Sequence, residues 1–237
     1  MHPAGKTAVV AGGMIAVVSD EELLKLPKGN WQEKMEHIVD GLDGKRPRLL
    51  LHACCAPCSS FCLESLLPHF DITVYFYNPN ITGAEEYERR KTEILRFVKE
   101  FGTDTGYPAA VRTEAHDTAA FFEAVRGYED VPEGGLRCVK CFRLRLNRSA
   151  ELAASEGFDY FTTTLTISPL KNAAVLNALG EEIGREKGVA FLPSDFKKKN
   201  GFFRSTELSR QYGLYRQDYC GCVFSKRERQ KKTEEDI

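Results

Sequence analysis

Short apolar runs alternate with longer segments of mixed polarity along most of this 237-residue chain. The first clear run, at 48–51, has the uninterrupted apolar character of a strand that is buried on both faces of a parallel sheet. The run at 72–77 also predicts a strand. The segment 85–101 that follows it places apolar residues on one helical face. These alternations are typical of βα units.

The same alternation continues toward the C-terminus. Strands are predicted at 48–51, 72–77, 109–112, 158–167 and 189–192, and helices at 30–42, from 59 or 60 to 67, and at 85–101, 118–126, 139–156, 171–187 and 201–216. Strands that alternate with helices of this length predict an α/β fold with an open, mostly parallel sheet in a three-layer, Rossmann-like arrangement. A helical, cysteine-bearing segment completes the C-terminal end of this fold.

Composition divides the chain into three parts. Residues 1–47 form an N-terminal extension, which we expect to be partly mobile because its Gly- and Ala-rich start has no clear period. We expect residues 48–225 to form a single α/β domain and residues 226–237 a charged tail. Hydrophobic residues make up 42% and charged residues 28% of the chain, values that are ordinary for a folded globular protein.

The net charge of −1 conceals a basic C-terminal part, since residues 196–232 carry eleven Lys and Arg against three acidic residues. No apolar run approaches the roughly 20 residues needed to span a bilayer. We therefore expect a cytoplasmic protein without a membrane partner. Eight cysteines in that reducing compartment favour metal binding or redox chemistry over structural disulfides.

Most of the cysteines fall in three groups. Cys54 and Cys55 follow the first predicted strand, where open α/β sheets bind ligands, while RCVKC at 137–141 opens a helix and YCGC lies at 219–222. A CxxC spacing brings two sulfurs to one turn, and four converging thiolates suit either tetrahedral zinc or an iron–sulfur cube. The pattern CCxxC, CxxC and CxC therefore predicts metal or redox chemistry, with buried structural thiols as the alternative.

The remaining thiols allow more than one interpretation. Gly221 lets the chain bring Cys220 and Cys222 together as a strained disulfide, a redox relay or a two-thiol metal site. Half of a structural zinc site is the less specific alternative. Cys58 lies close to the first pair and is a candidate additional ligand, whereas Cys62 is expected in the core.

Basic residues near the cysteine groups point to RNA. Residues 137–148 carry five cations and no acid, and the basic run 197–199 leads into NGFFR, whose aromatic residues can stack on an unpaired base. A solvated charged face is the alternative. The candidate RNA-binding residues are Arg137, Lys140, Arg143, Lys197, Lys198, Lys199 and Arg204.

Five motifs occur in a characteristic order between about residues 48 and 225. They are LLLHACCAPCSS, FYNPNI with the following EEYERRK, RCVKCFRLRL, TTTLTISPLKN and RQDYCGC. Together they resemble the QueH family of epoxyqueuosine reductases. The resemblance implies reduction of epoxyqueuosine to queuosine in tRNA, the last step of that modification, without cobalamin and with the modified anticodon loop as the substrate. Leu170 departs from the family pattern, in which a polar or aromatic residue is expected.

The resemblance also implies a [4Fe–4S] cluster. By that resemblance its ligands are Cys54, Cys55, Cys138 and Cys141. Cys220 and Cys222 are then a redox-active pair or ligands of an adjacent mononuclear metal ion, to which Cys58 is a further candidate ligand.

The implied reaction needs a cofactor on chemical grounds. Removing an epoxide oxygen as water to leave an alkene takes two electrons and two protons, and no amino-acid side chain delivers such electrons unaided. A metal cofactor and an unidentified electron donor are therefore expected. Cys220, Cys222 and Asp218 are the candidate catalytic residues, with His52 and Tyr219 as further candidate proton donors. A strand-end histidine bonded to backbone is the alternative for His52.

Three other functions compete with this interpretation. The first is a zinc-stabilised RNA-binding module without redox activity, in which the thiols are structural. The second is a nucleotide-activating enzyme of the ATP-pyrophosphatase type, disfavoured because HACCAPCSS has no glycine that would let backbone approach phosphates. The third is a thiol oxidoreductase, for which eight cysteines exceed the single exchange pair required.

Overall fold

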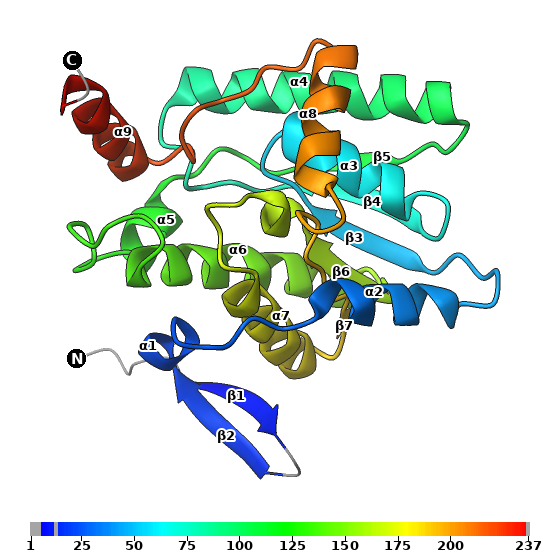
Figure 1. The fold of residues 1–237 in the computed structure, drawn as a ribbon, viewed down its shortest axis with the longest axis horizontal. Helices are drawn as coiled ribbons and strands as arrows, with labels where there is room; N and C mark the ends of the chain where they lie inside the picture. The colour runs from blue at the N-terminus through cyan, green and yellow to red at the C-terminus, as the bar shows by residue number, and fades with distance from the viewer. Residues whose placement is uncertain (1–5, 12–13, 236–237) are drawn as a thin grey trace.

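A five-stranded parallel sheet forms the centre of the computed structural model, which describes residues 6–11 and 14–235 (Figure 1). The sheet has the strand order β5-β4-β3-β6-β7, and every neighbouring pair is parallel. Its strands are β3 (Arg48–His52), β4 (Asp71–Phe76), β5 (Ala110–Thr113), β6 (Tyr160–Thr163) and β7 (Ala190–Phe191). The predicted α/β fold with a mostly parallel sheet is confirmed.

The apolar run of β3 serves both faces of this sheet. Successive side chains of a strand point to opposite sides. Leu49 and Leu51 accordingly pack into one apolar core, and Leu50 packs into a second. Helices cover both faces (Figure 1), with α3 (Ala56–Leu66), α4 (Ala84–Thr105) and α8 (Gly201–Gln211) contributing to the first core, and α6 (Leu136–Ser155) and α7 (Ala173–Lys187) to the second.

The strand order reverses at β3. From β3 the chain moves outward through β4 to β5, and it then returns to place β6 on the other side of β3. The carboxyl ends of β3 and β6 therefore diverge into different connections at one edge of the sheet. Such a switch point is where open α/β sheets bind their ligands.

Several predicted boundaries shift because of local capping. The strand predicted at 158–167 ends at Thr163, whose side-chain Oγ1 accepts a hydrogen bond from the Leu165 amide at 3.2 Å and starts the 3₁₀ helix η1 (Thr164–Ile167). Helix α3 starts at Ala56, ahead of the predicted serine caps, because the Cys55 Sγ accepts from the Cys58 amide at 3.4 Å. The predicted strand at 189–192 is reduced to two residues.

Further elements occur at both ends of the chain. An antiparallel hairpin of β1 (Lys6–Ala11) and β2 (Met14–Ser19) precedes α1 (Asp20–Leu23), where sequence periodicity predicts no element. The other helices are α2 (Trp31–Asp40), α5 (Ala119–Ala124) and α9 (Val223–Glu235), and α9 contains most of the predicted charged tail. Residues 1–5, 12–13 and 236–237, which belong to the predicted extension and tail, lie outside the described residues.

Helix length and polarity decide whether a segment can cross a bilayer. Within 6–11 and 14–235, no helix is both long enough and apolar enough to do so.

Close packing of α7 on the sheet generates a stability prediction. A Cβ atom on Gly184 would lie 2.6 Å from the Val189 carbonyl oxygen and 3.2 Å from the Phe161 ring. We expect Gly184→Ala to lower the free energy of unfolding by about 1–2 kcal/mol, because overpacking outweighs the gain in helix propensity. Urea denaturation measures this change. Gly41→Ala is the control, since its Cβ would meet nothing closer than 3.5 Å, and equal stability of the two variants would contradict the prediction.

Candidate metal centre

The first cysteine group lies at the sheet switch point. The Sγ atoms of Cys54, Cys55 and Cys58 all lie within 4.8 Å of one another, and those of Cys54 and Cys55 are 3.7 Å apart. The group follows β3 directly, and Asn78, from the motif FYNPNI, fixes its start by donating to the Ala53 carbonyl at 2.8 Å. Among the described residues, Cys54, Cys55 and Cys58 form the one group of His, Cys, Asp or Glu side chains whose spacing could hold a metal ion.

The three thiols of this group have different proton affinities. Hydrogen bonds from the Cys55 and Cys58 thiols lower the pKa of Cys54 well below its ordinary value. Burial raises the pKa of Cys55 to about 12, and the hydrogen bond to Cys54 raises the pKa of Cys58. The group therefore carries one thiolate readily, and a bound cation would favour the other two thiolates.

The second and third cysteine groups line a common cavity. Cys138 and Cys141 come from the first turns of α6, while Cys220 and Cys222 come from the segment that precedes α9. Burial raises the pKa of Cys141 to about 12 and that of Cys222 to about 11. Four thiols from two distant segments thus surround one space.

An ion pair and a serine hold these two groups together. The buried Arg137 donates to the Glu228 carboxylate of α9 at 2.6 Å and to the Glu129 carbonyl at 2.8 Å. The hydroxyl of Ser225 accepts from the Cys220 amide at 3.1 Å and donates to the Glu133 carboxylate at 2.9 Å. Helix α9 is therefore fastened to the loop that leads into α6.

A second buried arginine shapes the turn of the third group. Arg90, from the motif EEYERRK, forms an ion pair with Glu86 at 2.6 Å and donates to the Cys220 carbonyl at 3.1 Å. Gly221 has a φ of +119°, and a Cβ atom there would lie 2.9 Å from Ile81. Only glycine fits this turn without strain, which explains the CGC pattern.

A second cavity connects the first group with the third. Cys54, Cys58 and Cys220 line it, and Gln217 donates to the Cys55 Sγ at 3.0 Å. The two cavities adjoin, because the same five residues line both. These are Glu133, Arg145, Leu170, Lys171 and Cys220.

Two of the shared residues are cations. Burial acts to lower the pKa of Arg145, yet charge interactions with the sulfur groups of Cys141 and Cys220 raise it above its ordinary value. Burial likewise acts to lower the pKa of Lys171, but charge interactions with the sulfur groups of Cys220 and Cys54 raise it. Both side chains therefore remain positively charged beside the thiols.

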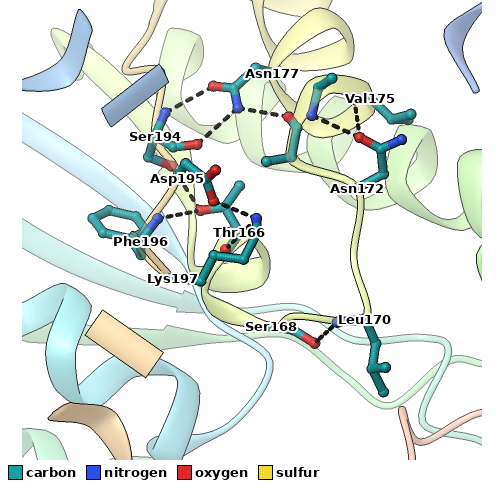
Figure 2. Close-up of polar contacts among 12 residues, drawn as sticks. Thr166, Ser168, Leu170, Asn172, Val175, Asn177, Ser194, Asp195, Phe196 and Lys197 are labelled. Carbon is teal, nitrogen blue, oxygen red and sulfur yellow. Dashed lines mark hydrogen bonds and ion pairs between the residues drawn. The ribbon is translucent and has the colours of Figure 1, made fainter. Parts of the chain in front are cut away.

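The loop that carries Leu170 and Lys171 is braced from behind. Thr166 lies 3.0 Å from Ser194 between their hydroxyl oxygens, and Asn177 exchanges two 2.8 Å hydrogen bonds with the Ser194 backbone (Figure 2). Figure 2 also shows the Leu170 side chain directed away from this network. Leu170 is 72% exposed and lines both cavities, so it presents an aliphatic group there.

The candidate proton donors have different environments. His52 is fully buried, and its ring nitrogens lie 2.9 Å from the Thr163 hydroxyl and 3.1 Å from the Tyr77 carbonyl. Burial lowers the pKa of His52 to about 3, so the ring is neutral, as expected for a strand-end histidine bonded to backbone. Asp218 and Tyr219, in contrast, line the second cavity.

Ion pairs engage most of the predicted RNA-binding cations. Lys198 is the exception, because it has no ion pair within the part of the chain that the structure describes. Charges paired in this way have less attraction left for phosphate groups. The pairs are Arg137–Glu228, Lys140–Asp20, Arg143–Asp20, Arg143–Glu182, Lys197–Asp195, Lys199–Glu36, Arg204–Glu64 and Arg204–Glu207.

Several residues of the site were missed from sequence. Arg90, Lys171 and Gln217 received no role, and Arg145 was counted only as a member of a basic run. One signal was present for Arg145, which stands four residues after Cys141 and hence on the same helical face. Lys171 and Gln217 lie within the motifs TTTLTISPLKN and RQDYCGC, but their approach to the thiols depends on the fold.

The fold and this site define an α/β protein with a cysteine-lined centre at the switch point of a parallel sheet. The family model described as epoxyqueuosine reductase QueH matches residues 49–228. The chain therefore belongs to the epoxyqueuosine reductase QueH family, and the resemblance inferred from the five motifs is confirmed.

Two curated relatives show how far the similarity extends. The epoxyqueuosine reductase QueH of Staphylococcus epidermidis is 42% identical over 206 residues, covering 85% of this chain and 87% of that protein. The protein of the same name from Streptococcus pyogenes serotype M1 is 46% identical over 180 residues, covering 76% and 71% respectively.

A solved structure shows a weaker similarity. The U34-tRNA thiolase NcsA from Methanococcus maripaludis, with its [4Fe-4S] cluster, matches with a TM-score of 0.46 and 13% identity over 89% of this chain and 70% of that chain. This similarity is too low to bear on the function.

The Arg137–Glu228 pair generates a prediction about how the site is held. Removing either partner leaves the other charge poorly compensated, so we expect Arg137→Met and Glu228→Gln each to destabilise the metal-free protein. The double variant should lose less free energy of unfolding than the two single variants lose together. We expect a coupling energy of about 1–3 kcal/mol, because partial exposure of Glu228 weakens the pair. Urea denaturation of the four proteins measures this coupling.

The control cycle uses the other ion pair of α9. Arg229 and Asp218 are exposed and 3.8 Å apart, so Arg229→Met and Asp218→Asn should couple by about 0.5 kcal/mol or less. Equal coupling in the two cycles would show that the buried pair has no special part in fastening α9.

Proposed function

We propose that this protein reduces epoxyqueuosine to queuosine in tRNA, in the cytoplasm, with a thiolate-bound [4Fe–4S] cluster. Membership of the epoxyqueuosine reductase QueH family supports the reaction. The observation that carries the cofactor is that six thiols from three distant segments line two adjoining cavities, with Cys55 grouped beside Cys54 and Cys58.

The residues present fit such a cluster. The cysteines supply soft thiolate ligands, which suit iron–sulfur clusters and zinc. Apolar side chains such as Phe121 and Phe142 line the first cavity and keep water away from it. Arg145 and Lys171 offset the negative charge that several thiolates and sulfide ions would bring. The donor set and the balance of charge both match an anionic metal–sulfur group.

The ligand set that follows from the family resemblance is Cys54, Cys55, Cys138 and Cys141. Its support is that Cys54, Cys55 and the partly buried Cys138 belong to one packed apolar cluster. In this assignment Cys220 and Cys222 act as a redox pair or hold an adjacent mononuclear metal ion.

A second assignment is favoured by how the thiols divide between the cavities. Cys138, Cys141, Cys220 and Cys222 line one cavity and offer four ligands for a cluster. The group of Cys54, Cys55 and Cys58 would then hold the mononuclear metal. The 3.7 Å separation of Cys54 and Cys55 is close to that expected for two thiolates bound at about 2.3 Å to one tetrahedral ion.

The reaction breaks both carbon–oxygen bonds of the epoxide and forms a carbon–carbon double bond. The oxygen leaves as water, which takes two protons, and two electrons come from an external electron donor. When bound, the cluster supplies these electrons one at a time. Asp218 and Tyr219 line the cavity that contains Cys54, Cys58 and Cys220, so they are placed to deliver protons to an oxygen bound there.

The substrate surface extends from the cavities onto α9. Leu170 and Phe202 line the second cavity and are exposed, which suits contact with the face of a nucleobase. Helix α9 starts directly after Cys222 and stands at one edge of the molecule (Figure 1). We assign the phosphates of the anticodon stem to its exposed cations and to Lys198. The α9 cations without an ion pair among the described residues are Lys226, Arg227, Lys231 and Lys232.

Cysteine substitutions test the cofactor and the reaction together. We expect Cys138→Ser and Cys141→Ser to abolish the iron and acid-labile sulfide of protein purified without oxygen, because both assignments use these ligands. In cells that lack this protein, tRNA should carry epoxyqueuosine in place of queuosine. Neither variant should restore queuosine, as measured by nucleoside analysis.

Cys62→Ser is the matched control. Cys62 lies in the core on α3 and lines neither cavity, so this variant should keep its iron and restore queuosine. The double variant Cys220→Ser, Cys222→Ser separates the two ligand assignments. It should keep the cluster if Cys54, Cys55, Cys138 and Cys141 are the ligands, and lose it if Cys138, Cys141, Cys220 and Cys222 are. Full iron content in Cys138→Ser and in Cys141→Ser would refute both ligand assignments. A colourless wild-type protein that holds zinc would instead favour the RNA-binding module.

Salt dependence tests the proposed RNA surface. The double variant Lys226→Gln, Lys231→Gln should bind tRNA more weakly than wild type. The slope of log Kd against log salt should decrease by about 0.7–0.9 for each phosphate that the variant no longer neutralises. Filter binding over a range of salt concentrations measures both. The control, Lys45→Gln with Lys99→Gln, removes two exposed cations outside both cavities and outside α9. An equal effect of the two double variants would contradict the placement on α9.

A further inference from the structure

Arg145 is a buried cation with unpaired donors. It lies one turn after Cys141 on α6, its side chain is fully buried, and neither Nη1 nor Nη2 has a hydrogen-bond partner among the described residues. The hydrogen bond it does make is a long one, from Nε to the Cys141 carbonyl at 3.4 Å. Because a guanidinium keeps its charge in proteins, a buried group of this kind requires an anion nearby.

The two other buried arginines show how this chain ordinarily meets that requirement. Arg90 forms an ion pair with Glu86, and Arg137 forms one with Glu228, and each also donates to backbone carbonyls. Arg145 forms no ion pair with a carboxylate within the part of the chain that the structure describes. Its missing partner is therefore an anion of a different kind.

Cysteine sulfur is the candidate for the missing anionic partner of Arg145. Arg145 lines both cavities and interacts electrostatically with Cys141, Cys220, Cys54 and Cys138. A guanidinium offers five N–H donors in a fixed planar fork, and thiolate or sulfide sulfur can accept from the unpaired ones. Lys171 shares the cavities but is partly exposed, so water screens its charge more strongly.

We propose that Arg145 is a positioning residue whose guanidinium pairs with the sulfur ligands of the cluster and raises the reduction potential of that cluster. The proposal rests on the proposed function, which supplies the cluster. Reduction adds one negative charge, and a fixed positive charge in a poorly hydrated site stabilises the reduced form more than the oxidised form. It holds for both ligand assignments, because Arg145 lines both cavities together with thiols of each assignment.

Redox titration of three variants tests this role. The holoproteins are purified without oxygen, and the midpoint potential is measured by titration with dithionite, followed by electron paramagnetic resonance. Iron and sulfide contents are measured on the same samples. Arg145→Gln should keep the cluster but shift the potential to a more negative value. Arg145→Lys, which keeps the charge and loses the fork, should recover part of that shift.

Arg148→Gln is the matched control. Arg148 lies three residues further along the same helix, and it is exposed and paired with Glu114 at 2.8 Å. Removing this charge should leave the potential unchanged because solvent already screens it. A shift equal to that of Arg145→Gln would show a general effect of net charge and would overturn the proposal.

The remaining outcomes each decide the question. An unchanged potential in Arg145→Gln at full iron content overturns the role of Arg145 and leaves the proposed function intact. If Arg145→Gln loses its cluster, Arg145→Lys decides the question. A retained cluster with a potential at or below that of wild type supports the proposal, whereas a potential above that of wild type, or loss of the cluster in both variants, overturns it. Wild-type protein without iron overturns the proposed cofactor and this proposal together.

Discussion

The parallel pairing of β3 with β4 on one side and β6 on the other is the constraint on which this site depends. It makes β3 the strand at which the sheet order reverses, so the chain after His52 and the chain after Thr163 leave the sheet in different directions. The space between them receives Cys54 from one connection and Lys171 from the other. A sheet whose order did not reverse there would offer no such crevice.

Charge then holds the more distant segments in place. Arg90 and Arg137 are buried, yet each is paired with a carboxylate, and together they fasten the segment with Cys220 and Cys222 to the rest of the molecule. Breaking either pair would leave a charge in a poorly hydrated region, so these contacts fix one arrangement of the thiols. Arg145 differs because sulfur is what surrounds it. The buried arginines thus differ in their partners: Arg90 and Arg137 hold segments of the chain through carboxylates, and Arg145 has the role proposed above.

The same pairing bears on the proposed RNA surface. Basic runs in the sequence suggest a surface along α6 and at 197–204, but most of those cations compensate carboxylates of this same chain. The α9 cations Lys226, Arg227, Lys231 and Lys232 are exposed and have no ion pair among the described residues, and the exposed Leu170 and Phe202 line the cavity that contains Cys54, Cys58 and Cys220. A charge count along the chain therefore locates the basic region, whereas the carboxylates facing each cation decide its use.

Local patterns along the chain were enough to establish the class of fold and the family, and to single out the cysteine groups as the candidate site. Apolar runs of strand length that alternate with helical periods are such patterns, and so are the cysteine spacings and the five motifs. The folded arrangement was needed to show that Cys138 and Cys141 share a cavity with Cys220 and Cys222, and that Arg145 and Lys171 stand between that cavity and Cys54. The physical reason is that strand order and long-range ion pairs set these distances, and neither leaves a periodic trace along the chain.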